Sequence, residues 1–412
     1  TITNSAYAGV YCNTSTSLHL VKVNKVSHSI ISNNSGRGGV QIEYSNLILS
    51  DVVIKNNSDR GGIVVTYNSH ADVSNSIIEN NSGSGNYTAG ITTTTYADLD
   101  IRNSIIRNNS GEGIDAYQGT ITAEDLTIEG NGGNGFYGND VNITINRGSI
   151  SNNGGTGYYG NDHSANFDSL TVMNNSGDGL KFSSQDATIR NSVIANNGDE
   201  GIVGQFFINL NIDSTTIANN SSNEMYLTSN VTIDLGSSIV YDDDPGPHVI
   251  FNPNTSYVAS NMTVSYSNIY GGSGAVNTNN HGTLTWGTGN VDRTPLFCDV
   301  DSSDYKLSAS SPCVGGGENG GNMGALGVGC PAIIGPVIEY ISDQTIQEDD
   351  SLQITVSATS DISDDVDIMA YSDTSAVSTS ITDSVLLLIP ASNWNGTSVI
   401  TVTAEDEFDL TD

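Results

Sequence analysis

Two copies of a short motif carry the side chains best suited to chemistry. Tyr137-Gly-Asn-Asp140 recurs further along the chain as Tyr159-Gly-Asn-Asp162, and His163 follows the second copy. Aromatic faces bind sugar rings, and two neighbouring aspartates can bind calcium or act as general acid and base if one pKa rises. We therefore single out Tyr137 and Tyr159 as ligand-binding residues and Asp140, Asp162 and His163 as catalytic candidates. The alternative is plain duplication, with Asn-Asp as a turn.

A second pair of acids, Asp178 and Glu200, has the same spacing as the two copies of the motif. If such positions stack, the two carboxyl groups lie about 5 Å apart, the separation found in retaining glycosidases. The equivalent positions of other repeats hold Arg, Ser, Asn and Thr. This scatter is typical of a turn that faces solvent, so we expect no catalysis there.

The overall charge excludes several partners. The chain has 12 Lys and Arg against 46 Asp and Glu, a net charge of −34. Such a surface repels nucleic acid and anionic lipid and attracts cations such as calcium, although selection for solubility in a saline habitat would produce the same bias. So few basic groups would stabilise an enolate poorly. The sequence contains no run of eighteen apolar residues and therefore predicts no membrane span.

A repeat must position these side chains. An Asn-Asn or Gly-Asn step recurs from Asn33 to Asn219 with a period of roughly 22 to 28 residues, which is typical of a solenoid. Each repeat alternates apolar and polar residues, the pattern of a strand, and is too short for a strand, a helix and a return strand. The sequence therefore predicts a solenoid whose turns stack about 4.8 Å apart. Asn at the corner tolerates a left-handed backbone, and its amide can bond to the next turn.

The repeat, as in Asn103-Ser-Ile-Ile-Arg-Asn-Asn-Ser-Gly-Glu-Gly113, resembles the right-handed parallel β-helix of the pectate-lyase-like superfamily. The resemblance covers residues 1–290 and implies an all-β domain of about eleven coils. It specifies architecture and leaves function open, because lyases, hydrolases, phage tailspikes and adhesins share this fold.

Residues 291–331 resemble the closing segment of secreted bacterial β-helix proteins, which covers the last coil. Cys298, Cys313 and Cys330 lie there, and this cluster favours an oxidised, extracellular clip with one thiol left over; the pairing stays open. Cys12 lies on the first coil. About eleven coils separate it from the cluster, roughly 50 Å, which is beyond disulfide reach.

Residues 336–412 lack the period of the repeat and form a separate domain. The segments Ile341-Ser-Asp-Gln-Thr-Ile-Gln-Glu-Asp349 and Trp394-Asn-Gly resemble tandem cadherin-like repeats of bacterial surface proteins. The resemblance implies an antiparallel β-sandwich of the cadherin or immunoglobulin type, with about seven strands. It also implies calcium binding at the domain ends by Glu348, Asp349, Asp361 and Asp406.

The last strand of this domain is missing from the pattern at Asp412. Either the natural protein continues into further repeats, or another copy supplies the strand and filaments form. We expect an extracellular or cell-surface structural and adhesive protein, an adhesin, surface-layer or fibre component. Its partners would be polysaccharides or other copies of itself. The alternative is a secreted polysaccharide lyase or glycoside hydrolase that acts along the β-helix.

Overall fold

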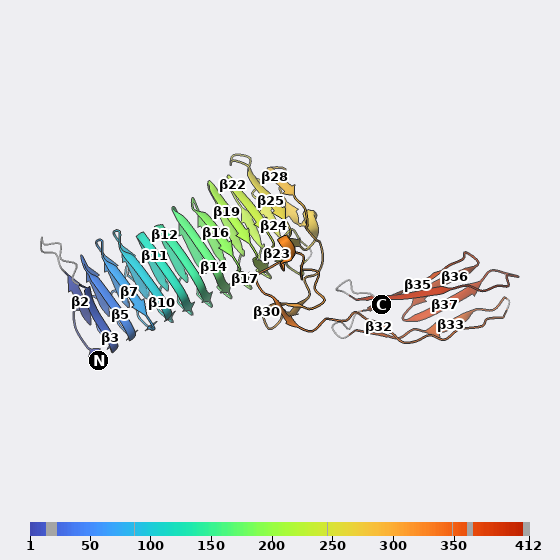
Figure 1. The fold of residues 1–412 in the computed structure, drawn as a ribbon, viewed down its shortest axis with the longest axis horizontal. Coiled ribbons are helices and arrows are strands. Elements are labelled where there is room, and N and C mark those ends of the chain that lie inside the picture. Colours follow the sequence, from blue (N-terminus) through green and yellow to red (C-terminus); the bar gives the residue numbers. More distant parts are fainter. Residues whose placement is uncertain (14–22, 86, 245, 348, 361–365, 407–412) are drawn as a thin grey trace. The chain divides into compact units, whose positions relative to one another are not determined.

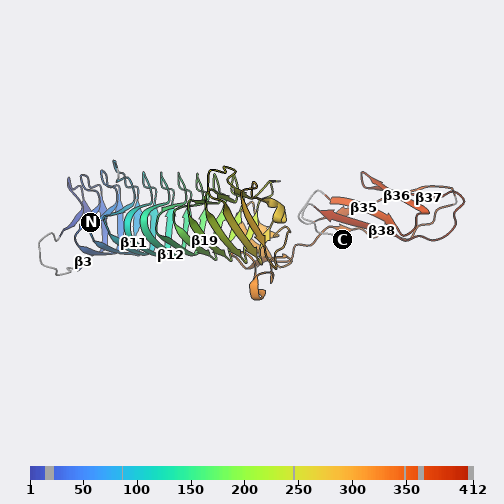
Figure 2. The same ribbon diagram turned by 90° about the horizontal axis from the view of Figure 1, so that it is seen from above.

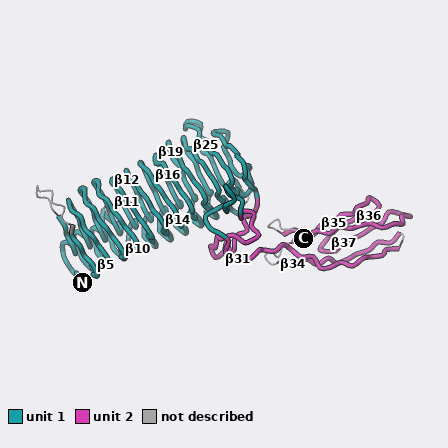
Figure 3. The backbone as a smooth tube through the Cα atoms, in the orientation of Figure 1, with its two compact units in different colours: residues 1–292, 315–327 teal, residues 293–314, 328–412 magenta. Residues whose placement is uncertain are grey.

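The computed structural model describes residues 1–13, 23–85, 87–244, 246–347, 349–360 and 366–406. The chain divides into two compact units, residues 1–292 with 315–327 and residues 293–314 with 328–412 (Figure 3). The first unit is a parallel β-helix of about 13 turns (Figures 1 and 2). The predicted all-β solenoid is therefore confirmed.

Each turn of the solenoid contributes up to three short strands, and equivalent strands pair in parallel to form three long sheets. Strands of the first sheet are β2 (Val10–Asn13), β4 (Val40–Glu43), β6 (Ile63–Thr66), β9 (Ile91–Thr94), β13 (Tyr158–Asn161), β15 (Leu180–Ser183), β18 (Ile202–Gln205), β21 (Met225–Leu227), β24 (Val249–Phe251) and β27 (Val276–Asn277). Strands β11 (Ile114–Glu129) and β12 (Phe136–Ser151) run through all three sheets.

The second and third sheets share several strands that bend at a residue with positive φ. These shared strands are β3 (Val23–Ser32), β5 (Asn46–Lys55), β10 (Asp98–Arg107) and β14 (Ser164–Met173). The second sheet adds β7 (His70–Ser74), β16 (Asp186–Arg190), β19 (Ile208–Asp213), β22 (Val231–Gly236), β25 (Ser260–Ser265) and β28 (Gly282–Trp286). The third sheet adds β1 (Ile2–Thr3), β8 (Ile77–Glu79), β17 (Val193–Ala195), β20 (Thr216–Ala218), β23 (Ile239–Tyr241) and β26 (Asn268–Ile269).

Helix is almost absent from the solenoid. A short 3-10 helix, η1 (Gly272–Ala275), follows β26. Among the described residues, no helix is long and apolar enough to cross a membrane.

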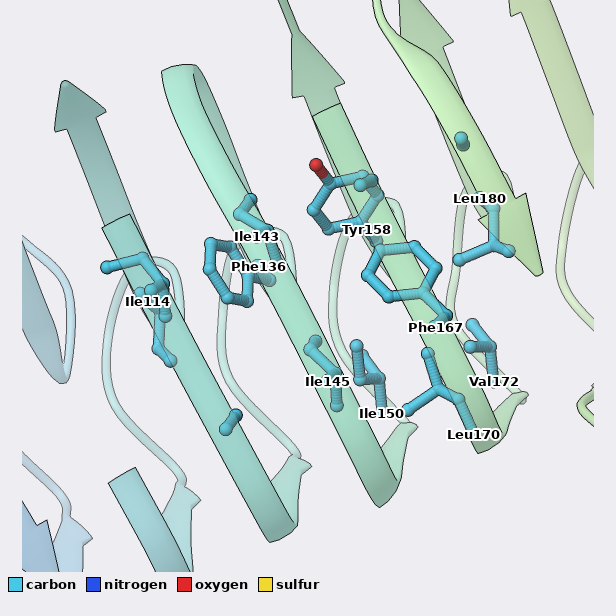
Figure 4. Packing of buried hydrophobic residues seen from close by; sticks show 14 of the residues in the cluster. Ile114, Phe136, Ile143, Ile145, Ile150, Tyr158, Phe167, Leu170, Val172 and Leu180 are labelled. Carbon is cyan, nitrogen blue, oxygen red and sulfur yellow. The ribbon is translucent and has the colours of Figure 1, made fainter. Parts of the chain in front are cut away.

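Inward side chains form columns because each residue lies above its equivalent one turn earlier. Ile114, Phe136, Tyr158 and Leu180 make one such column, and all four are fully buried (Figure 4). The ring of Tyr158 packs edge-on against Phe136 and Phe167, with ring centroids 5.6 and 4.9 Å apart. Apolar burial along these columns is the main stabilising force of the solenoid.

An asparagine ladder runs along one corner of the solenoid. Each side-chain Nδ2 donates to the Oδ1 of the next asparagine, at 2.9 to 3.0 Å. The members are Asn34, Asn57, Asn81, Asn109, Asn131, Asn153, Asn175, Asn197 and Asn220. The residue before most of them has a positive φ, as in Asn152 with a φ of 57°. The predicted role of the Asn-Asn corner is therefore confirmed.

The number of turns exceeds the predicted eleven. Strands β1 and β2 already form a turn before the first Asn-Asn corner, and β21 to β28 continue after the last one. A final rung is the bridge between Asn268 and Val291. The corners of these turns lack the asparagine step that marks the repeat, so the sequence pattern does not fix their exact number.

The predicted closing segment, residues 291–331, is divided between the two units. Residues 315–327, which include η2 (Glu318–Gly320), belong to the first unit and contact outward residues of the solenoid. Ala325 N donates to Thr216 Oγ1 at 3.1 Å, and Gly324 N donates to Ser237 O at 2.7 Å. The segment thereby covers outward residues of two late turns, including Ile239, which is fully buried.

The remaining closing residues belong to the second unit. They form β29 (Phe297–Asp299), β30 (Asp304–Ser308) and β31 (Val328–Cys330). A disulfide joins Cys298 and Cys330, while Cys313 is a buried thiol outside it. Cys12 is a half-buried thiol in β2. The expected clip with one cysteine left over is confirmed, and its pairing is now assigned.

The C-terminal residues of the second unit form three small antiparallel sheets. They pair β32 (Val337–Ile338) with β34 (Ala358–Thr359), β33 (Leu352–Thr355) with β37 (Val385–Pro390) and β36 (Val377–Thr382), and β35 (Val366–Ser372) with β38 (Ile400–Asp406). Val356, Val377, Leu386 and Leu388 are the centre of a small core. Residues 407–412, where the last strand was expected to be missing, lie outside the described residues.

Candidate functional site

The first sheet presents an outward face that carries most of the candidate residues. Residues at alternate positions of its strands point away from the core, so equivalent outward residues form rows along the solenoid. We call the outward residues of β4 to β24, with the turns that flank them, the outer face of the first sheet. Both copies of the Tyr-Gly-Asn-Asp motif contribute to this face.

Three tyrosine rings contact one another at the centre of this face. Tyr137 and Tyr159 are in register on adjacent turns, and their ring centroids are 5.4 Å apart with the rings nearly perpendicular. Tyr117, which the sequence analysis did not select, lies on the preceding turn with its ring 5.7 Å from that of Tyr137. All three are half-buried. The Lys181 ammonium, next in the row, lies 5.8 Å from the Tyr159 ring centroid. The four side chains form a continuous tyrosine row.

Packing inside the solenoid explains why the second copy of the motif has a glycine, Gly160, after its tyrosine. Gly160 faces inward, and a Cβ atom there would collide with Gln185 and with the phenol of Tyr158. The Tyr158 hydroxyl donates to Gln185 Oε1 at 3.0 Å. Glycine therefore leaves room for the buried ring of Tyr158 behind the half-buried Tyr159, and the strand keeps its alternation of inward and outward residues.

Asp140 lies at a bend inside β12, and Asp162 and His163 lie in the equivalent bend that follows β13. Asp140, Asp162 and His163 all have positive φ, of 60°, 59° and 71°. His163 Nδ1 lies 2.9 Å from Asp140 Oδ1, and Gln118 Nε2 donates to Asp140 Oδ2 at 3.3 Å. Asp140 is thus paired with a histidine and an amide, while the side chain of Asp162 is exposed. The structure therefore places the side chains of Asp140 and His163 in contact. A catalytic role for Asp140, Asp162 and His163 stays a prediction.

A cleft of about 360 Å³ opens beside Asp140 on the same face. It is lined by Tyr87, Thr94, Thr95, Tyr117, Gln118, Asn139 and Asp140. These residues offer two phenol rings together with hydroxyl and amide groups that can donate and accept hydrogen bonds. Such a lining suits a ligand rich in hydroxyl groups.

Asp115 is a buried residue of the outer face of the first sheet. It points outward from β11 but is 6% exposed, with Tyr137 above it in register. Burial, followed by the charge of Glu112, raises its pKa to about 7, and the Tyr117 hydroxyl opposes the shift by hydrogen bonding. Burial and the charge of Asp115 also raise the pKa of Tyr117 to about 12. The sequence did not reveal this residue, because an outward position in a strand normally predicts exposure.

Exposed aromatic residues border the face at several turns. The rings of Tyr44 and Tyr67 are nearly parallel, with centroids 4.9 Å apart. Tyr96 and Phe207 are 60% and 66% exposed. All four residues have positive φ, between 51° and 59°. Bulky residues avoid this backbone conformation unless the surroundings impose it. Aromatic side chains are therefore held outward at the rim.

The structure corrects the interpretation of Asp178 and Glu200. Asp178 was expected to face solvent, yet it is 4% exposed, and Lys181 Nζ from β15 lies 2.9 Å from its Oδ2. Burial, followed by contacts with Asp199 and Asp178, raises the pKa of Glu200 to about 8. A lysine three residues after an acid in the repeat is the signal that could have indicated this pairing.

The predicted calcium ligands of the C-terminal domain are only partly described. Glu348 and Asp361 lie outside the described residues. Asp349 Oδ1 accepts from Asn393 N, and Asp406 Oδ2 accepts from Ser360 Oγ, each at 3.2 Å. Asp406 pairs with the first residue of β35, whereas Asn393 follows β37 at the opposite end of the strands. Asp349 and Asp406 therefore lie at opposite ends of the domain, and calcium binding there stays a prediction.

Comparison with known proteins supports the architecture. Residues 87–236 match the family described as "Right handed beta helix region". Together with the sheet topology, this match identifies the fold of the first unit as a right-handed parallel β-helix.

Two solved structures are similar to the chain. The crystal structure of pectate lyase Pel9A is 14% identical with a TM-score of 0.46, and the similarity covers 71% of this chain and 89% of that one. The tailspike protein gp49 from Pseudomonas phage LKA1 is 13% identical with a TM-score of 0.44, and the similarity covers 93% and 66%. No curated protein matches the sequence. These similarities are too weak to carry a function to this chain. The cadherin-like resemblance stays a prediction.

Proposed function

We propose that the chain is an extracellular structural or adhesive protein that binds a neutral polysaccharide along the outer face of the first sheet. The observation that carries the proposal is the row of contacting rings of Tyr117, Tyr137 and Tyr159. The row follows the long axis of the solenoid, so it offers a series of equivalent contacts to an extended chain of sugars. Each phenol combines an apolar ring with a polar hydroxyl, as a sugar ring requires.

Hydrogen-bonding side chains accompany the row. Asn139 and Asn161 are in register beside the tyrosines, and Asn161 Nδ2 donates to Asn139 Oδ1 at 2.9 Å. Both amides keep further donor and acceptor capacity for hydroxyl groups of a ligand. The cleft beside Asp140 adds Thr94, Thr95 and Gln118.

The charge of the chain favours a neutral ligand. With a net charge of −34, the protein repels an acidic polysaccharide unless cations screen the charges. The disulfide between Cys298 and Cys330 is typical of an oxidising, extracellular location. Adhesion or fibre formation would use the solenoid as a rigid rod.

The alternative of a polysaccharide lyase or glycoside hydrolase has less support. The carboxylate of Asp140 is paired with His163 and Gln118, and Lys181 is paired with Asp178. The Asp140 carboxylate and the Lys181 ammonium are therefore both engaged with other side chains, and neither is available to a reacting sugar without breaking that pairing. A binding surface requires no such arrangement.

Electrophoresis of the full chain through gels that contain a polysaccharide tests the proposal. We expect neutral polysaccharides to retard the protein and acidic ones to leave its mobility unchanged. The same mixtures, assayed for reducing ends and unsaturated products, should show no turnover. Release of products would contradict the non-enzymatic role, and unchanged mobility in every neutral gel would contradict glycan binding.

A further inference from the structure

Three carboxyl groups meet where the corner of the solenoid leads into β15 and β18. Asp178 and Glu200 occupy equivalent positions on successive turns, and Asp199 precedes Glu200. One oxygen from each of the three side chains lies within 4.8 Å of the others. Asp178 is buried, Glu200 is half-buried and Asp199 is exposed. The cluster is therefore open to solvent on one side.

An unpartnered oxygen points to a missing ligand. Asp178 Oδ2 accepts from Lys181 Nζ at 2.9 Å, whereas Asp178 Oδ1 is buried with no hydrogen-bond donor among the described residues. A buried carboxylate oxygen without a partner is costly, and native structures rarely leave one. The carboxyl groups of Asp199 and Glu200 donate to it only when they carry a proton, and the raised pKa of Glu200 shows that a proton is held in this cluster when no cation is bound.

The charge of the three carboxyl groups also indicates that a cation is missing from this cluster. When all three groups are ionised, three carboxylates lie beside the ammonium group of Lys181, which is paired with Asp178 Oδ2. Like charges this close repel one another unless a proton or a cation lies between them. A divalent cation would displace the proton held by Glu200, balance the negative charge of the three carboxylates and give Asp178 Oδ1 a partner.

We propose that Asp178, Asp199 and Glu200 form a calcium site that joins two successive turns of the solenoid. All three donors are carboxylate oxygens, and calcium prefers oxygen ligands and accepts irregular geometry completed by water. Magnesium demands a stricter octahedron, and zinc prefers nitrogen and sulfur donors. The exposed side at Asp199 leaves room for the waters. This site is separate from the ligands predicted in the C-terminal domain and does not depend on polysaccharide binding.

Calorimetric titration of the chelator-treated full chain with CaCl₂ tests the proposal. Asp199→Asn removes an exposed ligand and should leave the fold intact, which thermal unfolding monitored by circular dichroism verifies. We expect the affinity of this site to fall at least about tenfold in this variant and in Glu200→Gln. The control Asp234→Asn removes an exposed charge from β22 and should bind calcium like the wild type.

Two outcomes overturn the proposal. The first is a set of calcium isotherms that are identical for the wild type, Asp199→Asn and Glu200→Gln. The second is an equal loss in the Asp234→Asn control, which would show that net charge alone determines binding. A calcium event that persists in all variants would be assigned to another part of the chain, such as the C-terminal domain, and would equally reject this site.

Discussion

Asn220 ends the asparagine ladder on the carboxylate of Glu224. Its Nδ2 donates to Glu224 Oε2 at 2.6 Å, and its backbone N donates to Oε1 at 3.1 Å. Glu224 is fully buried, and burial raises its pKa well above the usual value for glutamate. The next amide of the ladder is thus replaced by a carboxyl group that accepts both hydrogen bonds.

We predict that Glu224→Ala destabilises the solenoid by about 2 to 3 kcal/mol, because it leaves two buried donors of Asn220 without an acceptor. Glu224→Gln should cost less, since its amide oxygen still accepts one bond. Urea denaturation of both variants measures the difference. Losses below about 0.5 kcal/mol for both substitutions would show that the ladder needs no terminal acceptor.

Ile128 tests the assignment of inward and outward positions. Ile128→Ala should reduce the free energy of unfolding by about 2 to 5 kcal/mol, because it opens a cavity in a fully buried column. Thr122→Ala, at an exposed position of the same strand β11, should cost less than about 0.5 kcal/mol. Equal losses in chemical denaturation would contradict the assignment.

Asp115 should make stability depend on pH. Its pKa is about 7 in the folded protein and about 4 in the unfolded chain, so the folded state binds the proton more tightly. Its contribution is therefore complete below about pH 4 and is lost as the pH rises to about 7. Asp115→Asn should be more stable than the wild type at pH 8, by on the order of 1 to 2 kcal/mol, and should unfold at higher temperature. A difference between the two proteins that is the same at pH 4 and pH 8 would contradict this role.

The disulfide should stabilise the second unit alone. It closes a loop with a sequence separation of 32 residues, for which a cost of about 2 to 4 kcal/mol on removal is typical. Cys298→Ser combined with Cys330→Ser should lower the unfolding temperature of the second unit and leave that of the solenoid unchanged. Calorimetry of the full chain resolves the two transitions. A lower transition for the solenoid would indicate that the disulfide acts on both units.

Much of the fold could be predicted from the sequence because the regular period of the repeat places equivalent side chains above one another. That period correctly places Ile128 inside and the rings of Tyr137 and Tyr159 in contact. Positions whose burial depends on a partner from another turn were not predictable. Asp115 is covered by neighbouring tyrosine side chains.

Asp178 was missed for a related reason. Its carboxylate is paired with Lys181, three residues further on, whereas the equivalent positions of other turns hold residues of different types, so the column does not predict burial. The role of Glu224 was missed because the chain breaks the asparagine repeat there, so the residue has no equivalent in other turns. The repeat pattern of the sequence thus predicts which side chains stack in inward columns. Side-chain partners that differ from turn to turn can be identified only from the structure.

The most direct test of the account is the affinity of a neutral polysaccharide for the full chain after removal of two rings, Tyr137→Ala with Tyr159→Ala. The control is Tyr340→Ala, which removes a ring that is 91% exposed in the other unit. We predict that the double variant binds at least about tenfold more weakly, since each lost stacking contact is worth about 1 kcal/mol, while the control binds like the wild type. Equal dissociation constants for the double variant and the wild type, with both proteins folded, would contradict a binding surface on the outer face of the first sheet.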